Sequence, residues 1–159
     1  MSAAGDIVRD IYARLNASVG GGLLFEWHME SQPVAVVEAG ADYPSLHVGL
    51  PRLGEESLGS NLATEIVMFT FAVSSKRQSS EEAVQDIQEE VAKHLDFLKA
   101  IQNSVELNTA DPRLSDPLLN GRLLEPMRWD VGTVNINAGS YGTELRLTMR
   151  SRAVNRGAR

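Results

Sequence analysis

The sequence predicts an α+β fold: a mostly antiparallel sheet of about four to six strands, with an N-terminal helix and one long amphipathic helix packed on it. Two neighbouring stretches carry this prediction. Residues 65–73 (EIVMFTFAV) alternate with the period of a strand, and one face holds Val67, Phe69, Phe71 and Val73. After a Ser-rich link, in which Ser79 or Ser80 is the expected helix cap, apolar side chains recur at helical spacing: Val84, Ile87, Val91, Leu95 and Leu98.

The elements before this pair are shorter. Residues 6–16 predict an amphipathic helix whose apolar face excludes Asp10 and Arg14, and glycines 20–22 end it as a flexible connector. Residues 23–29 and 33–38 are short apolar segments that could pair as a hairpin. Residues 45–50 alternate like a strand, and residues 51–62 then form the long loop of a hairpin into the 65–73 strand.

The second half of the chain is less regular. Residues 99–126 hold no sustained period and contain several turn dipeptides, so we expect a long irregular loop there. Residues 128–137 predict a strand with a bulge at Gly132. Residues 143–151 alternate clearly, with Leu145, Leu147 and Met149 facing inward and charged side chains facing outward. Residues 153–159 are expected to form a basic tail, either frayed or used in binding.

Length and composition fit one domain over residues 1–159, folded in a reducing cytoplasm. The chain contains no cysteine, which excludes disulfides and thiolate chemistry. No apolar run reaches the ~18 residues of a membrane span, so no membrane role is expected. The net charge is −6 although the last ten residues hold four arginines and no acid, so the body is strongly acidic. An acidic body argues against sequence-specific nucleic-acid binding.

The residues that usually carry chemistry are dispersed. His28, His47 and His94 have no second ligand at metal-binding spacing, which favours structural or surface roles. Acidic side chains gather on the long helix at Glu81, Glu82, Asp86, Glu89 and Glu90, and a solvated face explains them better than a metal site does. We therefore predict no catalytic residue, no metal and no cofactor. An enzyme that uses this acidic face with a metal is the alternative.

One charged feature stands out against the acidic body. Arg146, Arg150 and Arg152 lie on the outward face of the last strand, and Arg128 joins them if residues 128–137 pair with that strand. A solvated outer face explains this stripe. A docking surface explains it equally well, because a single-sign stripe on a protein of opposite charge favours oriented association. We take these four arginines as the candidate interface.

The order of these elements resembles the tail terminator, or tail completion, family of long-tailed bacteriophages. The resemblance rests on the N-terminal helix and Gly-rich link, Tyr43-Pro44 before an apolar strand, the strand EIVMFTFAV, the helix SSEEAVQDIQEEVAKHL and the final strand TELRLTMRSR. It implies a small α+β subunit that assembles into a hexameric ring. Such a ring caps the tail tube at the head-proximal end of the virion and contacts the tail tube protein and neck or connector proteins. The family has no catalytic residues.

Two other readings remain. Another head–tail connector or neck protein would share the absence of catalytic groups. A small non-viral binding module that dimerises through its sheet is an explanation from a different class. Identical subunits that close head-to-tail need two different complementary patches, and an acidic body with a basic strand supplies them.

Overall fold

The computed structural model describes residues 2–20, 26–30, 44–76, 84–108, 111–136 and 140–155. Within them the chain forms helices α1 (Ala3–Gly20) and α2 (Val84–Glu106), the 3₁₀ turn η1 (Pro112–Leu114) and eight strands. The strands are β1 (Glu26–Glu30), β2 (Ser45–Gly49), β3 (Arg52–Ser57), β4 (Leu62–Lys76), β5 (Arg128–Val131), β6 (Asn135–Ile136), β7 (Ser140–Arg150) and β8 (Val154–Asn155). The α+β class is confirmed, with more strands than expected.

The sheet is organised around two long strands. Its main order is β1-β2-β4-β7-β5, while β3 and β8 add to β4 and β6 adds to β7. All pairs are antiparallel except β1 with β2, which run parallel. The strands β3, β6 and β8 extend the two edges of the β4–β7 pair, which is why the strand count exceeds the predicted number.

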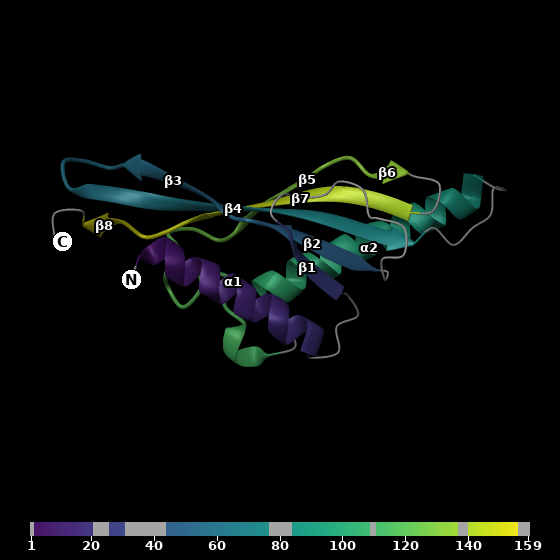
Figure 1. Cartoon of the computed structure of the whole chain (residues 1–159), viewed down its shortest axis with the longest axis horizontal. Coiled ribbons are helices and arrows are strands. Elements are labelled where there is room, and N and C mark those ends of the chain that lie inside the picture. The colour runs from purple at the N-terminus through teal and green to yellow at the C-terminus, as the bar shows by residue number, and fades with distance from the viewer. Residues whose placement is uncertain are drawn as a thin grey trace.

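Both helices pack on the same side of this sheet (Figure 1). The β4 side chains predicted to face inward are fully or almost fully buried, as are those of β7. They meet one apolar face of each helix: Ile7, Ile11 and Leu15 from α1, and Leu98, Ile101 and Val105 from α2. Aromatic rings from α1 and from two strands, β4 and β5, continue the core: Tyr12, Phe69, Phe71 and Trp129. The period-two and helical patterns therefore converge on a single core.

The long helix differs from its prediction in length and in its buried face. It continues to Glu106, so the expected irregular loop is wrong for residues 99–106. Its buried face runs through His94, Leu98, Ile101 and Val105, whereas Leu95 is exposed. A step of one residue turns the helix by ~100°, which moves Leu95 off the face that contacts the sheet. The cap expected at Ser79 or Ser80 lies outside the described residues.

Residues 51–62 are not a long loop. Arg52–Ser57 forms β3, which pairs with residues 63–68 of β4, and a short turn joins the two strands. The prediction failed because every side chain of β3 is exposed, so the strand has no alternation of buried and exposed positions. Backbone pairing to β4 holds it in place.

The bulge expected at Gly132 is consistent with the register. Val131 pairs with Leu145 and Asn135 pairs with Gly142, so the segment between β5 and β6 is one residue longer than its partner on β7. The Gly132 backbone N–H donates to the Glu144 carbonyl at 2.9 Å. The segment predicted as residues 33–38 and the tail beyond Asn155 lie outside the described residues.

One buried arginine ties the helices together. Arg14 is fully buried, although the sequence placed it on the polar face of the first helix. Its guanidinium donates to Asp10 within α1 and to the carbonyls of Val105 and Glu106 at the end of α2. Helix carbonyls at a C-terminus have no partner within the helix. Arg14 supplies donors to them and a positive charge at the negative end of the helix dipole.

Candidate interface on the uncovered face of the sheet

The sheet face away from the helices carries the residues singled out in the sequence. On β7 the inward side chains are buried, while Glu144 and Arg146 are exposed and Arg150 is half-buried. The register partners of Arg146 and Arg150 on β4 are Thr70 and Ile66. Because paired residues project to the same side, this face combines arginines with a half-buried row from β4.

The strand that carries Arg128 does pair with the last long strand. β5 runs antiparallel to β7, and Arg128 lies opposite Thr148, between Arg146 and Arg150 along the same face. Arg152 follows the end of β7 and is exposed, and its backbone N–H donates to the Arg122 carbonyl at 2.9 Å. The structure therefore brings Arg128, Arg146 and Arg150 together on one face and leaves Arg152 at its end.

The face is not of a single sign, which corrects the sequence interpretation. Arg150 forms ion pairs with Glu56 at 2.9 Å and Glu125 at 3.8 Å. Arg146 lies 3.6 Å from Glu144, and Asp130 is its register partner on β5. Glu144 shares the outward face of β7 with Arg146, whereas the other acids come from β3, β5 and the segment before β5 and are brought to this face by the tertiary structure.

Two of the four predicted arginines keep an uncompensated charge. Arg128 and Arg152 are exposed, and neither has an ion pair with another described residue. Exposed, unpaired guanidiniums can form bidentate bonds with a carboxylate from another molecule without first breaking a bond within the chain. Arg52 of β3 lies in the same row across the sheet as Arg128, is exposed and has no ion pair in the described part of the chain, so the basic character of the interface rests on these three residues.

Two shallow hollows lie on this face. One of about 380 Å³ lies beside the β5–β6 connection and includes Asp130 and Asn135. Another of about 350 Å³ lies over β3 and β4 and includes Arg52 and Met68. Glu144 and Arg146 line both hollows. This lining offers hydrogen bonds, ion pairs and a small apolar contact, which suits recognition of a protein surface.

The uncovered face continues into a projecting hairpin. We call β3, the turn that follows and residues 62–65 of β4 the arm. Figure 1 shows the arm reaching past the N-terminal end of α1. At the base of the arm, the Ala4 backbone N–H donates to the Glu65 carboxylate at 2.6 Å, so β4 supplies an acceptor to the first turn of α1.

A buried histidine forms a network that the sequence did not reveal. His94 comes from the buried face of α2, and its Nδ1 lies 2.5 Å from the Ser75 hydroxyl of β4. Its Nε2 lies 2.7 Å from the Thr143 hydroxyl of β7. Nearby, the Tyr141 hydroxyl donates to Glu90 at 2.7 Å. Three elements distant in sequence supply these groups, so no local motif could have predicted them.

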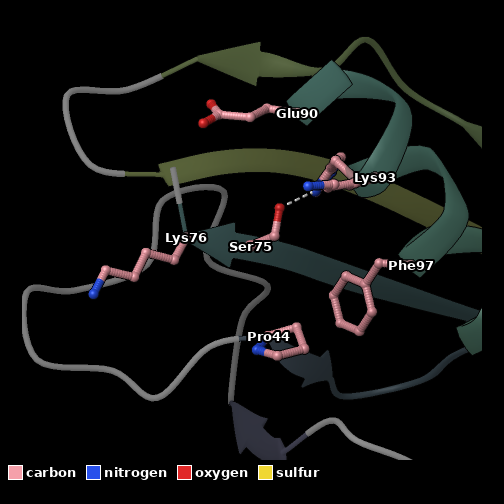
Figure 2. A pocket seen from close by; sticks show the side chains of 7 residues that line it. Pro44, Ser75, Lys76, Glu90, Lys93 and Phe97 are labelled. Atoms are coloured by element: carbon pink, nitrogen blue, oxygen red, sulfur yellow. Dashed lines mark hydrogen bonds between the residues drawn. The ribbon is translucent and has the colours of Figure 1, made fainter. Parts of the chain in front are cut away.

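This network borders a pocket of about 270 Å³ at the end of β4, between Pro44, Phe97 and the first turns of α2 (Figure 2). Burial lowers the pKa of His94 to about 4, so the imidazole is neutral at pH 7. A neutral imidazole accepts one hydrogen bond and donates another, which two hydroxyls satisfy. An imidazole with so low a pKa is a weak general base. Both ring nitrogens of His94 bond hydroxyls, whereas the histidine of a serine hydrolase bonds a carboxylate through one of them. The network is therefore suited to fixing α2 on the sheet.

The acidic face of α2 has no geometry for a metal in the part that is described. No group of three His, Asp, Glu or Cys residues able to hold a metal ion occurs among the described residues. Glu89 is exposed and Glu90 bonds Tyr141, while the side chains of Glu81, Glu82 and Asp86 lie outside the description. No helix in the described ranges is long and apolar enough to cross a membrane.

A scan against protein-family models gave no match, and a search of curated proteins found no related sequence.

Proposed function

We propose that this chain is a structural virion protein, the subunit of a ring that caps a tail tube and joins it to the head or neck. A hexamer is the ring expected from the resemblance of the sequence to tail terminators. Its partners in this proposal are further copies of itself, the tail tube protein and the neck or connector proteins. No reaction is assigned to it.

The observation that carries the proposal is the asymmetry of the subunit. Both helices cover one face of the sheet, while the other face and the arm are left without cover from the described elements. A subunit that joins its neighbours head-to-tail must present two dissimilar surfaces, and cyclic rings are built in this way. The antiparallel α+β fold is also the class that the resemblance implies.

The test is the mass of the purified chain by size exclusion with light scattering across a concentration series, followed by negative-stain imaging. A six-fold ring supports the proposal. A stable two-fold dimer would contradict it and favour the small binding module. A chain that stays monomeric at every concentration would contradict assembly by the chain alone.

A further inference from the structure

The pocket beside His94 lies at the end of the sheet that is far from the arm (Figure 1). Its volume of about 270 Å³ is just below the ~300–1,000 Å³ of drug-sized ligand sites, so it fits a small molecule or a single side chain of another molecule. The described residues that line it come from the segment before β2, the end of β4 and α2. The proposed ring does not use this pocket.

One side of the pocket is apolar. The rings of Phe97 and Pro44 lie on the same side of the Ser75 hydroxyl (Figure 2). Phe97 is partly buried, and it contacts the His94 ring edge-on, with 6.5 Å between the ring centroids. Aromatic rings pack well against other flat groups in offset-stacked or edge-to-face arrangements. This side of the pocket therefore favours a ligand with an aromatic body.

The middle of the pocket is polar but uncharged. The Ser75 hydroxyl lies 2.5 Å from Nδ1 of His94, and the Thr143 hydroxyl lies 2.7 Å from Nε2. His94 itself is 1% exposed and is neutral at pH 7, because burial lowers its pKa to about 4. A hydroxyl that bonds one partner retains capacity for another hydrogen bond. Ser75 can therefore bond a polar atom of a ligand, held in position by the histidine behind it.

The charged side chains of the lining favour an anion. Lys76 and Lys93 are exposed, and neither ammonium group has an ion pair or a hydrogen bond in the described part of the chain. Glu90 is the one acid among the described lining residues, and it accepts a hydrogen bond from Tyr141 at 2.7 Å. Two ammonium groups and one carboxylate leave a net positive charge on a chain whose overall charge is −6. A hollow of positive charge attracts anions even on an acidic protein.

The same residues discriminate between kinds of anion. A phosphate would meet the ammonium groups, but it would leave the apolar side beside Phe97 and Pro44 unfilled. The carboxylate of Glu90 also opposes a second negative charge in so small a volume. A single carboxylate attached to an aromatic ring matches both the charged and the apolar parts of the lining.

We propose that this pocket binds a small aromatic carboxylate. The ring packs beside Phe97 and Pro44, and the carboxylate bonds Ser75 and Lys93, with Lys76 at the mouth. In this state Nδ1–H of His94 donates to Ser75, whose hydroxyl donates to the carboxylate. The same chemical group occurs in a free small acid and in the aromatic C-terminal residue of a polypeptide. The proposal does not depend on the proposed ring.

Titration of the full, isotope-labelled chain at pH 7, followed by NMR, tests the class of ligand. Three probes separate the contributions: N-acetylphenylalanine carries the ring and the carboxylate, N-acetylphenylalaninamide carries the ring alone, and inorganic phosphate carries charge alone. A ligand of this size should bind with a Kd on the order of 1 mM. The acid should shift the amide resonances of Ser75, Lys93 and Phe97 until they saturate. The other two probes should bind about fivefold more weakly or worse, which is the effect of one exposed ion pair.

Three results of this titration would overturn the proposal. One is binding of the uncharged amide as tightly as the acid, and another is equally tight binding of phosphate. The third is a set of shifts confined to residues outside the pocket.

Variants test the residues themselves. Lys76→Met combined with Lys93→Met should weaken binding of the acid about fivefold or more and leave binding of the amide unchanged. Lys99→Met, on the exposed surface of α2 outside the lining, is the matched control and should bind like the unmodified chain. Phe97→Leu should weaken binding of both the acid and the amide. Full affinity of the double lysine variant for the acid would contradict the proposed contact. Circular dichroism of each variant separates a loss of binding from a loss of fold.

A peptide distinguishes the two sources of the carboxylate. Glycylglycylphenylalanine presents the same ring and carboxylate at the end of a backbone. Tighter binding of this peptide than of N-acetylphenylalanine supports a polypeptide terminus as the natural ligand, whereas weaker binding supports a free acid. If neither binds at about 10 mM, well above the Kd expected for their size, the pocket is not a site for this class of ligand.

Discussion

Replacing Arg14 by methionine should cost this protein a large part of its stability. The side chain is 1% exposed, and its guanidinium donates to Asp10 at 3.0 Å. It also donates to the carbonyls of Val105 at 2.6 Å, Glu106 at 2.7 Å and Asp116 at 2.6 Å. Arg14→Met keeps much of the side-chain volume and removes every donor.

The expected loss follows from what stays behind. Asp10 remains a carboxylate whose side chain is only 7% exposed, with Arg122 at 3.2 Å as its remaining ion pair. Removing one partner of a buried ion pair costs about 3–5 kcal/mol. The free energy of unfolding of a typical domain is ~5–15 kcal/mol, so this loss amounts to at least about a fifth of it.

The assay is urea unfolding at pH 7 followed by circular dichroism. The matched control is Arg9→Met on the same helix, where the side chain is 60% exposed and pairs with Asp6 at 2.8 Å. An exposed pair of this kind is worth about 1 kcal/mol or less. The double variant Arg14→Met with Asp10→Leu should regain part of the loss, because it leaves no buried charge unpaired.

Equal losses for Arg14→Met and Arg9→Met would refute this reasoning. So would a double variant that is less stable than the sum of its single changes predicts, because the two residues would then not act as a buried pair.

Three further perturbations have defined outcomes. The pKa of His94 is about 4 in the folded chain against 6.5 when unfolded, so the unfolding free energy should fall by up to about 3 kcal/mol as the pH drops from above 6.5 to 4. In urea titrations, His94→Gln should reduce this dependence of the unfolding free energy on pH. An unchanged pH dependence would exclude His94 as its source. Phe71→Ala removes a fully buried ring between two other aromatic rings and should cost about 3–5 kcal/mol in the same assay, whereas a loss below ~1 kcal/mol would place Phe71 outside the core. Arg146→Glu with Arg150→Glu should lower the assembled mass in light scattering, because it reverses two charges of the candidate interface. An unaltered mass would remove these two arginines from the interface.

The sequence determined those elements whose pattern is local. The alternation of residues 65–73 and 143–151 is a property of each segment alone, and the structure confirms both inward faces. The strand that carries Arg128 was also predicted, whereas its pairing with the last long strand was left open and is supplied by the structure. In α2, Ile101 and Val105 continue the helical spacing beyond Leu98, so the full helix could have been read from the sequence.

Other features depended on partners that are distant along the chain. β3 has no pattern of its own and is a strand only because β4 offers it backbone groups. The Ser75–His94–Thr143 network joins two strands and a helix.

Tertiary structure alone decided which of these charged residues are buried and which have an ion pair. Asp10 and Arg14 follow the ordinary spacing of a solvent-exposed pair, yet they are buried because the end of α2 needs donors where α1 passes it. Arg150 is compensated by acids from β3 and the segment before β5, while Arg128 and Arg152 are not. Side-chain period is a local property of a sequence, whereas the partner of a charge is set by the packing of distant segments.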